Sequence, residues 1–527
     1  MSATRSLARA GLVVSAAFLA ARVLGWLRFV VIANVFGATA DLDAFIAAFR
    51  IPDLMFQLVA AGALSAALIP VVAGVLHTDG EARAWRVVST VTTLMLVALL
   101  VLAAFALVAA DRLVPLFTRG FDPATMARTI ELTRIMLLSP ILLALGAVAT
   151  SVLNARGRFA AAALAPIAYN VAIIGAVLLL APSMGVTGVA VGVVAGSASH
   201  LLVQLRPLRA IGFRYVPRID LSDRAARQAL ALMGPRAIGL GASQITFIVA
   251  TALATPLGTG ALTAFTSAFT LLQIPIGVIG VPLGVVLFPS LSREVATGNH
   301  DEFVSLLTRA MRLLAFVMIP IAAVAAILRI EGVSLLFRRF DPATVELIAA
   351  TLVAFLVGLA AHALIGVLAR AFYARQDTKT PVMAAILAVV VNTTLATLLV
   401  GPLQLPGIAL AIAIAAWVEA GVLLLLLHRR VGRLGLAQVA WLAVRTVLAT
   451  AVATIAAGIV HAAVAASLAP QATAVGLGSI LALVAIILVV TAVFAAVFAL
   501  AAIALRIEEL RSIVGIMVDA LRRPRRP

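Results

Sequence analysis

The chain has 527 residues, of which 64% are hydrophobic and only 11% are charged. Ordinary soluble proteins are roughly 45–50% apolar and about 25% charged. This composition excludes a secreted enzyme, a soluble nucleic-acid-binding protein and a disordered chain, and it indicates a membrane protein with many spans. The net charge of +18 comes almost entirely from arginine, and the lack of cysteine excludes disulfides and thiolate chemistry.

Apolar stretches long enough to cross a bilayer recur along the whole chain. A spanning helix needs about 20 mostly apolar residues, and the sequence predicts an all-α protein with about fourteen such helices. Their approximate ranges are 9–36, 43–76, 86–110, 126–153, 159–182, 185–205, 232–255, 261–290, 304–328, 343–373, 381–400, 406–427, 437–466 and 473–505. The first stretch contains Arg22 and Arg28 and has no clean cleavage site, so we expect a retained span rather than a signal peptide.

The distribution of arginine predicts how these spans are oriented. Cytoplasmic loops of membrane proteins are enriched in Lys and Arg, and most loop arginines fall inside if the N-terminus is inside. The loops then assigned to the outside hold only Arg112, Arg119, Arg329, Arg338 and Arg339. We therefore expect both termini in the cytoplasm, with the basic tail 506–527 on the anionic inner leaflet.

A sequence repeat predicts two related halves. Phe121-Asp122-Pro123-Ala124-Thr125 recurs 219 positions later as Phe340-Asp341-Pro342-Ala343-Thr344, and the same offset relates Gly188 to Gly407. Six helices per repeat preserve direction, so the halves are parallel, and a central cavity is expected between them. The predicted organisation is 1–205 (helices 1–6), a cytoplasmic linker 206–231, 232–427 (helices 7–12), 428–505 (helices 13 and 14) and the tail 506–527.

Polar side chains inside the predicted spans are the candidate functional residues, because a charge at mid-membrane costs at least ~2.5–3.5 kcal/mol. The second span is also interrupted by Pro52, which frees a backbone carbonyl. The substrate-binding candidates are Arg22, Arg28, Asp43, Arg50, Asp53, Gln57, Arg236, Gln244, Thr270 and Gln273.

The arginines in the first two spans indicate a cationic cavity for an anionic headgroup, because guanidinium binds phosphate bidentately. The alternative is that Arg28 and Asp43 extend to the outer interface while the other charges pair structurally. Asp43 and Arg50 are about 10 Å apart along a regular helix. We therefore expect Asp43 to pair with an arginine of the first span.

No nucleophile–base pair, metal-ligand cluster or Gly-rich phosphate loop is apparent in the sequence. We therefore expect a transporter with no catalytic residue, no metal and no cofactor. The membrane potential and a monovalent ion are the candidate energy sources.

The chain resembles the MurJ/MviN family of lipid II flippases in the MOP exporter superfamily. The stretches that carry the resemblance are Arg22-Val-Leu-Gly-Trp-Leu-Arg28, Phe36-Gly37, Asp43-Ala-Phe, Phe49-Arg50-Ile51-Pro52, Pro289-Ser-Leu-Ser292, Gly298-Asn-His-Asp-Glu302 and Phe372-Tyr-Ala-Arg-Gln-Asp-Thr-Lys-Thr-Pro381. The resemblance implies a fourteen-helix protein of the bacterial inner membrane that moves undecaprenyl-pyrophosphate-linked peptidoglycan precursor outward by alternating access. It also implies functional roles for Arg22, Arg28 and Asp43, a lipid-tail groove at helices 13 and 14, and cell-wall synthesis and division proteins as candidate partners.

The chain departs from the family pattern at three polar positions. Phe56 and Gln57 stand where the family often has an arginine, Thr270 aligns with another arginine, and Ala61 aligns with a glutamate. The headgroup cavity would thus be less cationic, and Arg236 is a candidate replacement for the lost charge.

Three other functions remain open from the sequence. A Wzx-like flippase of another polyprenyl-linked glycan or a MATE-like drug exporter would share the two-lobe plan, although a cavity for cationic drugs should be acidic and this one is basic. A membrane-embedded polyprenyl-phosphate enzyme would need acidic metal-binding loops, whereas Asp122 and Asp341 lie in turns that look structural. A non-transporting scaffold of the cell-wall machinery is the third.

Overall fold

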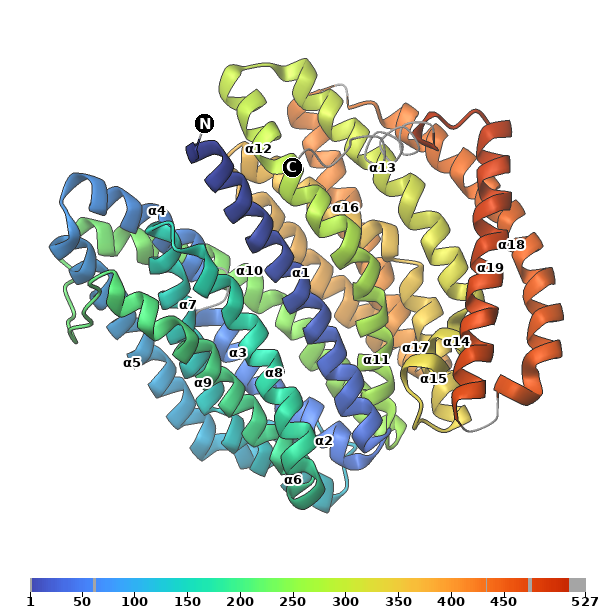
Figure 1. Ribbon diagram of the computed structural model, residues 1–527, viewed down its shortest axis with the longest axis horizontal. Coiled ribbons are helices and arrows are strands. Elements are labelled where there is room, and N and C mark those ends of the chain that lie inside the picture. The colour runs from blue at the N-terminus through green and yellow to red at the C-terminus, as the bar shows by residue number, and fades with distance from the viewer. Residues whose placement is uncertain (1, 60–62, 433, 473–475, 511–527) are drawn as a thin grey trace. The chain divides into compact units, whose positions relative to one another are not determined.

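The computed structural model describes residues 2–59, 63–432, 434–472 and 476–510, and these residues are almost entirely helical, with no β-strand among them (Figure 1). Contacts within the chain divide it into two compact units, Met1–Thr263 and Ala264–Pro527. The first unit therefore includes residues 232–255, which the repeat assigns to the second lobe. The predicted lobe boundaries rest on the repeat alone and stay a prediction.

The first unit is a bundle of ten helices within the described residues. They are α1 (Ser2–Phe36), α2 (Ala40–Ala48), α3 (Arg50–Val59), α4 (Ala63–Thr78), α5 (Glu81–Leu113), α6 (Pro123–Met136), α7 (Leu138–Ala155), α8 (Phe159–Met184), α9 (Val186–Ala210) and α10 (Arg224–Ala254), with short 3₁₀ turns at Val114–Leu116 and Thr255–Leu257. Helix α8 packs along α9 and α1, and α4 packs against α7 and α10. The core of the first unit is an apolar cluster that includes Leu68, Val72, Val88 and Val152, all fully buried.

The second unit contains the remaining helices. They are α11 (Ala261–Pro275), a π-helical turn (Ile276–Gly280), α12 (Val281–Thr297), α13 (His300–Ile327), α14 (Arg329–Leu336), α15 (Pro342–Leu356), α16 (Leu359–Ala374), α17 (Lys379–Val431), α18 (Leu436–Ala472) and α19 (Leu477–Ala504). The orange and red helices α18 and α19 lie side by side in Figure 1. Ala449, Ala453 and Ala457 are buried on α18 in the apolar cluster that contains Phe494 of α19. Small residues at four-residue spacing let two membrane helices approach closely.

Most of the predicted membrane helices are present, but the described helices do not confirm the count of fourteen. Eleven described helices are long and apolar enough to span a membrane, and α15 with α16 forms a further bent pair at 46°. The predicted spans 381–400 and 406–427 both lie in α17, which is broken at Gln404. The count of fourteen therefore stays a prediction.

The second predicted span, 43–76, is not one continuous helix but is divided among α2, α3 and α4. Pro52 explains the break after Ala48, because a proline ring clashes with the carbonyl four residues before it. That carbonyl, on Ala48, lies 3.5 Å from the buried Thr133 hydroxyl, which donates at 2.8 Å to the Thr129 carbonyl of its own helix. The carbonyl that we expected Pro52 to free thus faces a neighbouring helix but has only this long contact with it.

The two copies of the Phe-Asp-Pro-Ala-Thr motif form the same helix cap. Asp122 accepts hydrogen bonds from the backbone N–H and hydroxyl of Thr125 at 3.1 and 2.5 Å, and Asp341 accepts the same pair from Thr344 at 3.0 and 2.6 Å. The threonine hydroxyls and N–H groups lower the pKa of both aspartates below the ordinary 3.8. Both motifs are N-caps, as the structural interpretation of these turns predicted.

Two helical hairpins 219 residues apart also share their backbone geometry. Gly185, between α8 and α9, has φ 57° and ψ −141°, and Gln404, at the break in α17, has φ 50° and ψ −134°. A Cβ atom at Gly188 or at Gly407 would lie within 3 Å of the backbone of the leucine eight residues earlier. Glycine therefore permits the same close approach of two helices in each hairpin.

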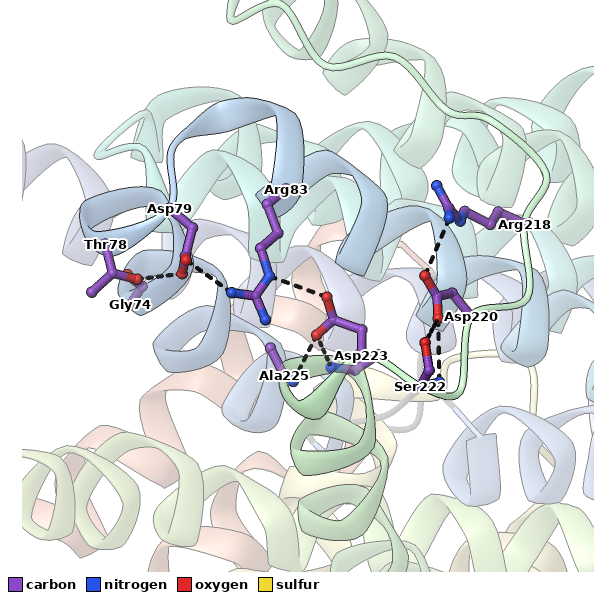
Figure 2. A network of polar contacts seen from close by, with 10 residues as sticks. Gly74, Thr78, Asp79, Arg83, Arg218, Asp220, Ser222, Asp223 and Ala225 are labelled. Carbon is purple, nitrogen blue, oxygen red and sulfur yellow. Dashed lines mark hydrogen bonds and ion pairs between the residues drawn. The ribbon is translucent and has the colours of Figure 1, made fainter.

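Polar contacts join α5 to the start of α10 in the first unit (Figure 2). Arg83 bridges Asp79 at 2.8 Å and Asp223 at 3.2 Å, and Asp223 caps α10 by accepting from the Ala225 N–H at 2.8 Å. Burial raises the pKa of Asp223, but hydrogen bonds from Arg83 and the helix N–H groups outweigh it and hold the pKa below 3.8. The start of α10 is thus anchored by charge to the start of α5.

Candidate functional site

The predicted site residues of the first unit form two separate groups. Arg50, Asp53 and Gln57 lie on α3 and face α10, whereas Arg22 and Arg28 lie on α1, which packs against α8. The basic side chains of the first two predicted spans are therefore not gathered on one helical hairpin.

The group on α3 is held by side chains of α10. The Nε atom of Arg50 donates to the Thr251 hydroxyl at 2.9 Å, and its guanidinium carbon lies 5.4 Å from the centre of the Phe247 ring. Asp53 accepts from Gln57 at 3.5 Å and also contacts the side chain of the buried Gln244. Four predicted residues, Arg50, Asp53, Gln57 and Gln244, thus form one half-buried polar cluster between α3 and α10.

The group on α1 contacts α8 instead. The Arg28 guanidinium carbon lies 5.2 Å from the centre of the Tyr169 ring, a cation–π distance. The amide of the adjacent buried Asn170 donates to the Ala21 carbonyl at 3.3 Å. Arg22 is half-buried and makes no hydrogen bond or ion pair with any described residue.

The expected ion pair between Asp43 and an arginine of α1 is wrong. The Asp43 side chain is 1% exposed, and its oxygens accept from the Gly260 N–H at 2.6 Å, the Thr263 N–H at 2.7 Å and the Thr263 hydroxyl at 2.6 Å. These N–H groups lie at the start of α11, where a helix leaves its first donors without partners and favours negative charge. Asp43 therefore acts as a helix cap, and both its oxygens are occupied.

The other predicted residues contribute less to a described site. Thr270 donates its hydroxyl to the Thr266 carbonyl within α11 at 2.7 Å, and Gln273 is exposed. Both lie in the second unit. The side chain of Arg236 lies outside the described residues.

Four contact residues were not predicted, namely Tyr169 and Asn170 on α8 and Phe247 and Thr251 on α10. Asn170 is a polar residue inside an apolar span, and this pattern in the sequence could have identified it as a candidate contact residue. An aromatic ring or a threonine in a membrane helix gives no such signal. Within the described residues no three His, Asp or Glu side chains lie close enough to hold a metal ion.

Comparison with known proteins identifies the family. The family model described as lipid II flippase MurJ matches residues 32–483. A lipid II flippase MurJ of Burkholderia cenocepacia is 33% identical over 438 residues, covering 81% of this chain and 84% of that protein.

Solved structures show the same fold. A structure of lipid II flippase MurJ in an inward closed conformation matches with a TM-score of 0.74 at 20% identity, covering 92% of this chain and 98% of that one. An inward-facing multidrug resistance MATE family transporter of the MOP superfamily matches with a TM-score of 0.67 at 18% identity, covering 79% and 95%. The family model and the Burkholderia relative each extend over most of this chain, and the chain therefore belongs to the lipid II flippase MurJ family.

Proposed function

We propose that this protein is a transporter that flips lipid II from the inner to the outer leaflet of the bacterial cytoplasmic membrane by alternating access. The relatives named above are lipid II flippases. The observation that carries the proposal is that Arg22 and Arg28 lie within a predicted span, yet neither forms an ion pair with a described residue. Charges in a membrane need a counter-charge, and a pyrophosphate would supply one that arginine binds bidentately.

The acidic residues of the same region argue against a cationic substrate. Asp43 is 1% exposed and its two oxygens accept from Gly260 and Thr263, so it is not accessible to a drug ammonium. Asp53 is shared with Gln57 and lies one turn from Arg50. The α1 and α3 groups together are therefore net basic, which favours an anionic headgroup over the substrates of a MATE-like exporter.

The test is complementation of a strain depleted of its lipid II flippase, together with a lipid II accessibility assay. Arg22→Ala and Arg28→Ala should abolish flipping, and the corresponding Arg→Lys variants should retain part of it, because lysine keeps the charge but not the planar fork. The matched control is Arg128→Ala, a half-buried arginine of the same unit at 4.0 Å from Glu131. Flipping at the parent rate by both alanine variants would overturn the proposed site.

The same proposal includes topology and energy source. Reporter fusions at 181–184 and 401–406 should be outside and fusions at Arg214 and Arg430 inside, which would place both termini in the cytoplasm. Transport in proteoliposomes should respond to a membrane potential or to a monovalent cation gradient, and collapse of both gradients should stop it. Cell-wall synthesis and division proteins are the proposed partners, and proximity labelling in dividing cells would identify them.

A further inference from the structure

A small cavity in the second unit lies outside the residues discussed so far. Its volume is about 170 Å³, and it is bounded by α13, α18 and the segment that follows α19. Gln438, Trp441 and Arg445 line it from one face of α18, at i, i+3 and i+7, while Arg312 lines it from α13 and Arg506 from the end of α19. Three arginines from three segments thus converge on one opening.

Two of the three arginines have no carboxylate partner among the residues that the structure describes. Arg312 is neutralised by Glu509 at 2.5 Å and by Glu508 at 3.7 Å. Arg445 and Arg506 form no ion pair with any described residue. The two glutamates that line the cavity both contact Arg312, so three guanidinium groups face two carboxylates and the lining keeps a net positive charge.

An aromatic ring orients one of these two arginines, and the other lies at a backbone turn. The guanidinium carbon of Arg445 lies 4.7 Å from the centre of the Trp441 ring, which orients the planar group. Arg506 has φ 52°, a left-handed conformation that is costly for any residue other than glycine. The segment after this turn carries Glu508 and Glu509, which contact Arg312 on α13.

The cavity lies beside an exposed apolar surface of α18. Trp441 is 58% exposed, and tryptophan is enriched where a helix crosses the membrane–water interface. An apolar stripe at helical spacing continues from it along α18 through Val444, Leu448, Val452, Ile455 and Ile459, each at least half exposed. A molecule with a phosphate at the arginines and an apolar tail along this stripe would match both surfaces.

We propose that this cavity binds the headgroup phosphate of an anionic phospholipid, with Arg445 and Arg506 donating to the phosphate oxygens and Gln438 at the rim. The bound lipid would tie the start of α18 to the end of α19. The site uses no residue of the α1 or α3 groups, so its occupancy can be measured whether or not the chain flips lipid II.

Native mass spectrometry of the full-length protein in detergent, titrated with phosphatidylglycerol, tests the proposal. The dissociation constant of the first bound lipid should be about tenfold or more higher for Arg445→Ala and for Arg506→Ala than for the parent, because each change removes charge-assisted hydrogen bonds. Arg309→Ala is the matched control, since Arg309 is an exposed arginine one turn from Arg312 that does not line the cavity. Unchanged affinity in both cavity variants, or an equal loss in the control, would overturn the proposal.

Two further measurements are needed. The first distinguishes loss of the site from loss of the fold, and the second distinguishes a bound lipid from bound free phosphate. Phosphatidylglycerol should raise the melting temperature of the parent and of Arg309→Ala but not of Arg506→Ala, whose side chain is exposed and whose removal leaves the helices intact. An equal rise in all three would refute the site. Inorganic phosphate at millimolar concentration should not displace the first bound lipid. Displacement of the lipid by phosphate would overturn the assignment of the site to a lipid.

Discussion

The buried carboxylate of Asp43 gives the sharpest test of the structure. Asp43→Ala removes three hydrogen bonds of 2.6–2.7 Å and leaves the N–H groups of Gly260 and Thr263 and one hydroxyl without partners. Hydrogen bonds to charged groups contribute about 1.5–3 kcal/mol each and are not fully additive, so we expect a loss of about 3–5 kcal/mol in the free energy of unfolding. Asp43→Asn keeps the shape but turns an amide NH₂ toward an N–H donor, and it should cost about 1–3 kcal/mol.

Thermal unfolding of the purified protein, followed by the fluorescence of its four tryptophans, measures both losses. Asp41→Ala is the control, because Asp41 is an exposed aspartate on the same helix. Thr263→Val should be costly in the parent and nearly neutral beside Asp43→Ala, because the hydroxyl then has no carboxylate to donate to. An equal cost in both backgrounds would refute the cap. Loss of flipping by Asp43→Asn at unchanged stability would show instead that this carboxylate serves transport directly.

Three other variants test local features of the fold. Gln404→Gly should raise the free energy of unfolding by about 1 kcal/mol, because φ 50° with ψ −134° favours glycine and the side chain is exposed; a lower melting temperature would contradict this. Asp223→Ala should lower the free energy of unfolding by about 1–2 kcal/mol through loss of its helix cap. Arg83→Ala should cost less beside Asp223→Ala than in the parent, because only its contact with Asp79 then remains to be lost; a melting-temperature cycle of the two variants measures the difference, and equal costs would contradict the bridge. For Asp122, whose pKa the Thr125 hydroxyl holds below 3.8, the stabilisation is present above that pH and is lost as pH falls through the lower folded-state pKa. The difference in melting temperature between the parent and Asp122→Asn should therefore be constant from about pH 7 to pH 5 and shrink below about pH 4, and a constant difference throughout would contradict the assignment.

Features that depend on neighbouring residues could be predicted from the sequence. Hydropathy and the scarcity of charge determine that the chain is a helical membrane protein, because each span satisfies its own backbone and needs only an apolar surface. The caps at Asp122 and Asp341 join residues three apart, and the effect of Pro52 on the carbonyl of Ala48 acts over four. The resemblance to the flippase family is likewise carried by short stretches of sequence, and the family model confirms it.

The partners of the polar side chains were decided only by the tertiary structure. Asp43 reaches Gly260, 217 residues away, and Arg50 reaches Thr251, 201 residues away. Contacts between residues so far apart in the chain produce no periodic pattern in the sequence from which they could be predicted. The sequence places Arg22 and Asp43 in consecutive spans and so suggests an ion pair, but α1 packs against α8 and the start of α11 takes the carboxylate. A charge in a membrane must find a partner, yet which partner it finds depends on which helices pack together, and packing of uniformly apolar helices is decided by the three-dimensional fit of their side chains rather than by hydropathy.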